Sequence, residues 1–367
     1  MKKLMLSFTL FILILMNIIS LDINAQKIDT DIVIDLIIQK FEDLDHRLDI
    51  IDKSIDDLSW YNRISDIAYI DKVYITGPPE ANITDTLALG AYNPVRFYTY
   101  IFIPRDIDPE KKYPLLVLPH GGVHAFFDIY HIHILREMIA QEYIVVAPDY
   151  RGSTGYGKWF YELIDYGGLE NQDVKSSRDY MVQNYEFVDS KRVGIVGWSH
   201  GGMIALMNIF EYPNDYQVAF AGVPVSDLVA RMGYADDDYR ELFSAKYHIG
   251  RTALDNIEEY RRRSPVNHAH KLKTPLLIHT NTNDDDVHVL EVEHLIRALK
   301  AEGKKFEYEI YQNIPGGHGF DRIDTRFAKE TRLKIYSFLA KELKPTRLLK
   351  TIKDIDRAAY LPLKFEK

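Results

Sequence analysis

The hexapeptide at 197–202, Gly-Trp-Ser-His-Gly-Gly, restricts the fold of this chain more than any other stretch. An apolar run at 192–196 precedes it and a helix-like run at 203–210 follows it, so the pattern predicts a strand, a very tight turn and a helix. A serine in such a turn has strained backbone angles, and side chains at the glycine positions would collide with the adjacent strand and helix. The turn is expected to expose the Ser199 hydroxyl and to direct the His200 N–H toward developing negative charge.

Two loops further along the chain carry an acid and a histidine. The strand-like run 275–279 leads into a polar loop with three consecutive aspartates at 284–286, and the run 306–311 leads to His318. Each feature alone is more simply a solvated loop or a turn histidine. Their coincidence, each after a strand and in the order Ser, Asp, His, predicts the catalytic triad of an α/β-hydrolase.

The motifs together resemble the catalytic domain of the prolyl oligopeptidase family of serine peptidases. The resemblance covers roughly residues 95–343. Its parts are the Gly-Trp-Ser-x-Gly-Gly turn at 197–202, an Asp-Tyr-Arg-Gly stretch within 149–157, an Ile-His run leading to Asp-Asp-x-Val at 278–287, and Gly-His-Gly-Phe at 317–320.

This resemblance implies that Ser199 is the nucleophile, Asp284 the catalytic acid and His318 the base. The acid loop is longer here than in relatives, so the residues alone leave Asp285 and Asp286 open as alternatives to Asp284. No metal ion and no cofactor is needed for this chemistry.

The resemblance also suggests the surroundings of the nucleophile. Several relatives use a tyrosine in the oxyanion hole, but the corresponding loop here has none, so backbone N–H groups of Gly121 or Gly122 are expected to act together with that of His200. Arg151 is expected to support loops close to the active site. A specificity pocket is expected to draw on the segment 223–234, including Leu228, Met232 and Tyr234.

From residue 95 onward the chain alternates apolar strand-like runs with helical patterns. This alternation predicts an α/β fold, namely a doubly wound, mostly parallel sheet with helices on both faces, preceded by an N-terminal helical segment. The expected organisation is a signal peptide at 1–25, a helical segment and linker at 26–94, the catalytic domain at 95–345 and a tail at 346–367. The predicted strands are 97–103, 115–119, 143–147, 193–196, 219–223, 276–279 and 306–311.

The N-terminus has the pattern of an export signal. Two lysines precede an apolar run from Leu4 to about Ile19, and a small residue, Ala25, comes before Gln26, which predicts cleavage between those two residues. An uncleaved membrane anchor is the alternative, because the apolar run is close to spanning length. The protein is therefore expected to be periplasmic or secreted.

Residues 28–60 show a heptad-like stripe. Apolar residues recur in alternating steps of four and three from Ile37 to Leu58, with charged residues on the other faces. Two interpretations stay open: a helix that packs across the hydrolase domain, or a short coiled coil that forms a homo-oligomer.

Composition excludes several classes of protein. The formal net charge is −9 and no long basic stretch is present, which argues against nucleic-acid binding. The chain has no cysteine, so disulfides and a thiolate nucleophile are excluded. The histidines between 120 and 133 lack the spacing of a metal-ligand set.

The sequence thus predicts acyl transfer on a small peptide or ester substrate. The resemblance favours peptides, and the bare mechanism also permits a secreted carboxylesterase, for example one acting on acylated polysaccharide. A non-enzymatic scaffold is disfavoured because all three triad side chains are present. Most members of the family carry a β-propeller that screens substrates; this chain has no room for one, so a more open site is expected.

Overall fold

The computed structural model describes residues 30–81, 83 and 85–360. The chain divides into two compact units, Met1–Asp45 and His46–Lys367. The first unit contributes to the described residues only the beginning of helix α2 (Thr30–Ile64). The predicted signal peptide at 1–25 lies outside the described residues. Among the helices that are described, none has the length and apolar character needed to span a membrane.

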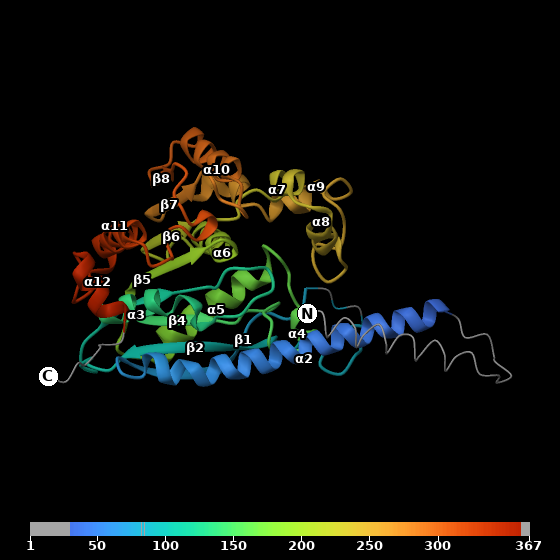
Figure 1. Cartoon of the computed structure of the whole chain (residues 1–367), viewed down its shortest axis with the longest axis horizontal. Helices are drawn as coiled ribbons and strands as arrows, with labels where there is room; N and C mark the ends of the chain where they lie inside the picture. Colours follow the sequence, from blue (N-terminus) through green and yellow to red (C-terminus); the bar gives the residue numbers. More distant parts are fainter. Residues whose placement is uncertain (1–29, 82, 84, 361–367) are drawn as a thin grey trace, which may run out of the picture. The chain divides into compact units, whose positions relative to one another are not determined.

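The second unit is built on an eight-stranded mixed sheet (Figure 1). The strand order is β1-β2-β4-β3-β5-β6-β7-β8. Neighbouring strands from β4 to β8 along this order pair in parallel. Strand β2 pairs antiparallel with both of its neighbours, β1 and β4. The predicted α/β architecture with a mostly parallel sheet is confirmed. The strands are β1 (Ala68–Thr76), β2 (Arg96–Pro104), β3 (Tyr113–Val117), β4 (Ile144–Pro148), β5 (Val188–Trp198), β6 (Val218–Gly222), β7 (Leu276–Asn281) and β8 (Glu307–Tyr311).

Helices cover both faces because alternate strand residues point to opposite sides. In β3, Leu115 and Val117 pack into one core cluster and Leu116 into another. Helices α5 (Leu169–Asn184), α6 (His200–Glu211) and α10 (Val289–Ala301) belong to the first cluster, and α3 (Ile132–Ala140), α11 (Arg326–Leu343) and α12 (Ile352–Ala359) to the second. The shorter helices are η1 (Ile129–His131), α4 (Lys158–Tyr161), α7 (Leu228–Tyr234), α8 (Asp237–Ser244), α9 (Ile257–Arg262), η2 (Pro265–Lys271) and η3 (Gly317–Gly319).

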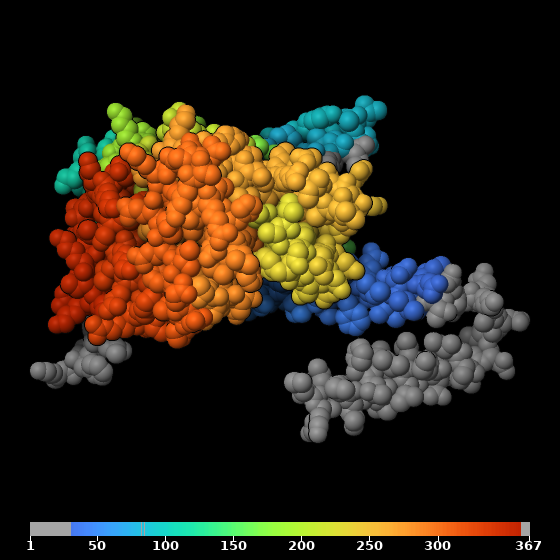
Figure 2. All heavy atoms as spheres, turned by 90° about the horizontal axis from the view of Figure 1, so that it is seen from above, coloured from blue at the N-terminus to red at the C-terminus, as the bar shows by residue number. Residues whose placement is uncertain are grey.

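The C-terminal part of the chain closes one end of the unit. In the space-filling view, the orange and red residues of the last third lie beside the yellow residues of α7 to α9 (Figure 2). The predicted tail at 346–367 contains helix α12, in which Ile355 is fully buried. Arg136 on α3 donates a hydrogen bond to the Ala358 carbonyl, so this segment is part of the packed core.

Part of the segment predicted as helix and linker at 26–94 belongs to the sheet unit. Strand β1, which the sequence analysis missed, pairs along its whole length with β2, and α2 from His46 onward is part of the same unit. Trp60 is 1% exposed and stacks on Phe127 with ring centroids 5.2 Å apart. In edge strand β1 only Ala68 and Ile75 are buried, and Asp71 and Lys72 interrupt its centre, so it lacks the continuous apolar run that marked the central strands.

Candidate active site

Ser199 occupies a strained turn at the end of β5. Its backbone angles are φ 59° and ψ −125°, outside the regions that side chains normally adopt. A Cβ at Gly197 would lie 2.1 Å from the Gly201 carbonyl oxygen, and one at Gly201 would lie 2.4 Å from the Pro119 carbonyl oxygen. Both glycines are therefore required by close backbone approach, as the motif predicts. Ser199 is followed directly by the first residue of α6.

A glycine-containing loop after β3 lies against this turn. A Cβ at Gly121 would be 3.4 Å from the Ser199 Cβ, and Gly122 adopts φ +80°. The Tyr150 hydroxyl donates to the His120 carbonyl (2.9 Å), and His120 Nε2 is 2.9 Å from the Ser153 hydroxyl. The His120 side chain therefore fixes the loop, and the backbone at 121–122 lies close to Ser199.

His318 is held by the aspartate loop after β7. Its Nδ1 lies 2.9 Å from each carboxylate oxygen of Asp284, whose side chain is fully buried. One Asp284 oxygen also accepts the backbone N–H groups of Asp286 and Val287. These contacts fix the orientation of the carboxylate toward the imidazole ring.

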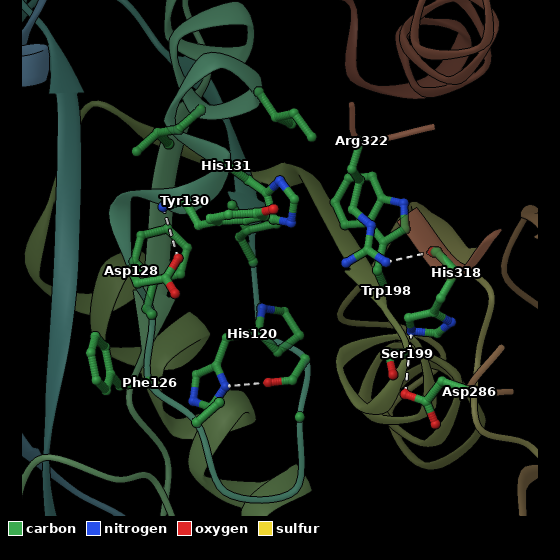
Figure 3. A pocket seen from close by; sticks show the side chains of 18 of the residues that line it. His120, Phe126, Asp128, Tyr130, His131, Trp198, Ser199, Asp286, His318 and Arg322 are labelled. Atoms are coloured by element: carbon green, nitrogen blue, oxygen red, sulfur yellow. Dashed lines mark hydrogen bonds and ion pairs between the residues drawn. The ribbon is translucent and has the colours of Figure 1, made fainter. Parts of the chain in front are cut away.

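The other two aspartates make different contacts. Asp285 accepts the backbone N–H of His318 at 3.0 Å, and this hydrogen bond lowers the pKa of the Asp285 carboxyl. Asp286 is bonded to Arg231 (2.6 Å) and lies 3.7 Å from His318 Nε2. In Figure 3, the side chains of Ser199, Asp286 and His318 lie together at one wall of a cavity. Of the three carboxylates, only that of Asp284 contacts His318 Nδ1, which leaves the other ring nitrogen, Nε2, on the side of Ser199 and Asp286.

The cavity beside Ser199 has a volume of about 280 Å³. Most of its wall is apolar or aromatic, and Arg322 and His131 stand on opposite sides of it (Figure 3). Arg322 donates to the His318 carbonyl oxygen at 2.7 Å, and burial lowers the pKa of His131 to about 3, so His131 is neutral at ordinary pH. The larger apolar lining residues are Trp60, Leu118, Phe126, Phe127, Ile134, Leu135 and Trp198.

Helix α2 contributes contacts to this site that the sequence analysis missed. Lys53 is 2% exposed, and its Nζ donates to the Phe127 carbonyl at 3.0 Å. The same Nζ lies 3.2 Å from Asp149, whose other carboxylate oxygen accepts the Phe127 N–H at 2.6 Å. Asp56 accepts the Ile129 N–H at 3.0 Å. The main chain at 127–129 is thus held from the helix and from the end of β4.

A sequence signal for these contacts exists in retrospect. Lys53, Asp56 and Trp60 recur at helical spacing on the face of α2 opposite its apolar stripe. Asp149 is the first residue of the Asp-Tyr-Arg-Gly stretch, two positions before Arg151.

Arg151, predicted to support loops, is fully buried; its side chain pairs with Asp173 through two hydrogen bonds and donates to the carbonyls of Pro78 and Pro79, so it holds that segment against α5. The residues predicted for a specificity pocket do not line the cavity beside Ser199. Leu228 and Met232 are buried in the core, and Tyr234, which donates to Glu291, lines a separate hollow beside the aspartate loop.

Within the described part of the chain, no group of three or more His, Cys, Asp or Glu side chains is arranged to hold a metal ion. The histidines at 120–133 instead make contacts inside the protein: His124 stacks on Tyr161 and His133 Nε2 lies 2.8 Å from the Arg322 carbonyl oxygen.

Comparison with known families agrees with this geometry. Residues 130–346 match the model of the prolyl oligopeptidase family. The chain belongs to this family.

The chain is 30% identical over 216 residues to the uncharacterized peptidase YuxL of Bacillus subtilis, covering 58% of this chain and 32% of that protein. It is 26% identical over 293 residues to the acylamino-acid-releasing enzyme of Arabidopsis thaliana, covering 76% of this chain and 38% of the relative. The chain thus spans about a third of the length of these relatives.

Solved structures share the fold. The acylaminoacyl peptidase of Pyrococcus horikoshii superposes with a TM-score of 0.63 at 21% identity, covering 79% of this chain and 44% of that one. The dipeptidyl peptidase 4 of Porphyromonas gingivalis gives a TM-score of 0.57 at 24% identity, covering 76% and 36%.

Proposed function

We propose that this protein is a serine peptidase that cleaves short peptides through an acyl-enzyme on Ser199. The observation that carries the proposal is His318, whose Nδ1 contacts a buried Asp284 while its ring stands beside the strained Ser199 turn. Family membership supports peptides as the substrate class, since relatives are named as peptidases and as acylamino-acid-releasing enzymes.

In the proposed mechanism, His318 Nε2 takes the hydroxyl proton as Ser199 attacks the scissile carbonyl, and then gives it to the leaving amine. Asp284 keeps the imidazole in the required tautomer and stabilises its protonated form. Water attacks the acyl-enzyme in the second half of the reaction, with His318 again acting as base, and restores the free serine.

The oxyanion is stabilised by backbone N–H groups. We assign this role to His200 and to the loop of Gly121 and Gly122. Support comes from the close approach of Gly121 to Ser199 and from the position of His200 as the first residue of α6, where N–H groups are unpaired. The adjacent cavity of about 280 Å³ fits a small apolar portion of a short peptide.

We also propose that the protein is exported as a periplasmic or secreted enzyme and acts as a homo-oligomer through α2. The export proposal rests on the lysine-led apolar run that ends at Ala25. N-terminal sequencing of the protein recovered outside the cytoplasm should begin at Gln26; a chain that retains Met1 and stays in the cytoplasm contradicts export.

The nucleophile assignment predicts the behaviour of Ser199→Ala. This variant should lose covalent labelling by a fluorophosphonate, and its kcat should fall by on the order of 10⁴-fold or more, because the triad acts as a unit. Circular dichroism and the melting temperature serve as controls for folding. Labelling that survives in the folded variant would contradict the assignment.

The acid loop predicts an order of effects among three matched variants. Asp284→Asn should reduce kcat by roughly 10⁴-fold, because the amide no longer fixes the His318 tautomer. Asp285→Asn and Asp286→Asn should each have a much smaller effect, because Asp285 bonds the His318 backbone and Asp286 is held by Arg231. Steady-state hydrolysis of a small activated ester or peptidyl anilide gives the comparison. If Asp286→Asn is the most impaired, Asp284 is not the catalytic acid.

The contacts of α2 predict that Lys53 is a positioning residue. Lys53→Met removes the donor to the Phe127 carbonyl and leaves the buried Asp149 carboxylate without its lysine partner, so the loop that carries Gly121 and Gly122 should shift. Because oxyanion donors act mainly in the transition state, kcat should fall by roughly tenfold to hundredfold with little change in KM.

Lys175→Met is the matched control for this prediction. Lys175 is a largely buried lysine that pairs with two carboxylates, those of Asp179 and Asp215, away from the 127–129 main chain and from Lys53. Its kcat should remain close to that of the native protein. A folded Lys53→Met protein with unchanged kcat would show that the helix does not position the loop.

A further inference from the structure

Helix α2 presents two opposite faces with different partners. Written as heptads, its exposed apolar residues occupy every a and d position over four consecutive repeats. All eight are between 44% and 71% exposed: Ile34, Phe41, Leu48 and Ile55 at a, and Ile37, Leu44, Ile51 and Leu58 at d. A continuous stripe of this length on a water-facing helix is a typical interaction surface.

The face opposite this stripe packs on the catalytic unit. The f positions from residue 46 onward are His46, Lys53 and Trp60; the ring of His46 lies 5.0 Å from that of Tyr161, and the other two contact Phe127. Since f is diametrically opposite the a and d positions, the part of the stripe from Leu48 to Leu58 points away from the surface that the helix covers. The two interpretations of the heptad pattern are therefore compatible, because different faces of one helix serve them.

The charges beside the stripe indicate what covers it. The g positions carry Lys40 and Arg47, and the e positions carry Asp45 and Asp52. In a parallel, in-register pair, each g residue meets the e residue five positions later on the partner, which joins Lys40 to Asp45 and Arg47 to Asp52. An antiparallel pair would place g against g and e against e, so that like charges meet.

These charges are available for such pairing. In the part of the chain that the structure describes, neither Asp45, Arg47 nor Asp52 has an ion-pair partner within the chain, and Lys40 approaches only Asp43, at 3.9 Å with both side chains largely exposed. Acidic residues outnumber basic ones along α2, which disfavours an anionic lipid surface as the partner.

We propose that two copies of this chain associate through a parallel, in-register coiled coil formed by residues 34–58 of α2. This inference rests on the homo-oligomer proposed for α2 and specifies its geometry, and it does not depend on the proposed chemistry. Each copy keeps its catalytic unit on the outer side of the helix pair, held through Lys53 and Trp60. The helix that positions the active-site loop would thus also be the dimerisation element.

Two neighbouring isoleucines give a matched test of the surface. Ile51 stands at a d position and Ile50 at a c position, and they are 53% and 41% exposed. Light scattering should give the mass of two chains for the native protein and for Ile50→Glu. The mass should halve for Ile51→Glu, because two like charges would face each other in the seam. Fluorophosphonate labelling checks that each variant is folded. The proposal is overturned if the native protein is monomeric in light scattering, or if it binds anionic vesicles as a monomer.

The orientation can be tested by cross-linking, because the chain has no native cysteine. Ile37→Cys and Leu58→Cys lie on the seam about 30 Å apart along the helix, at 1.5 Å per residue. In a parallel, in-register pair each single variant faces its own copy and should form a disulfide-linked dimer on mild oxidation. The off-seam Ile50→Cys should not. Failure of both seam variants to cross-link within a dimeric protein would exclude the parallel arrangement.

Discussion

Three backbone segments meet at Ser199 with no room for a side chain between them, and the site depends on this close approach. The strand before the serine contacts the helix after it at Gly197 and Gly201, and the loop containing Gly121 lies against the serine Cβ. A single added methyl group at Gly197 or Gly201 would require backbone to move. The same close approach would bring main-chain N–H groups beside the serine, so the proposed nucleophile and the proposed oxyanion donors share one structural cause.

Buried charge extends this arrangement to the N-terminal helix. Lys53 is surrounded by the carboxylates of Asp56, Asp57 and Asp149, and its ammonium group also bonds main chain. Burial alone would raise the pKa of Asp57, but hydrogen bonds from Lys72 and Tyr100 lower it overall, so the carboxylate stays charged beside the lysine. A buried cation without these partners would carry a large desolvation cost, and the helix is therefore tied to the loop electrostatically as well as by packing.

In the aspartate loop, three adjacent identical residues make three different sets of contacts. Asp284 is fully buried against the imidazole, Asp285 accepts from the main chain of His318, and Asp286 is drawn toward Arg231. Arg231 is itself buried, and it forms an ion pair with the buried Glu291 at 3.7 Å. Polar and charged residues beside Asp286 line a hollow separate from the largely apolar cavity, and Asp286 borders both.

The sequence alone determined the local features of this protein. The strained turn, the order of the proposed triad side chains and the central strands follow from glycine spacing and from apolar runs, which depend on near neighbours. Tertiary structure decided which of the three aspartates meets His318, that Leu228 and Met232 belong to the core, and that Lys53 and Trp60 reach the active-site loop. These contacts join residues far apart in the chain, and they depend on polar side chains or on single residues that belong to no repeating pattern. No local periodicity encodes such pairings, since their partners come together only when the sheet and helices are assembled.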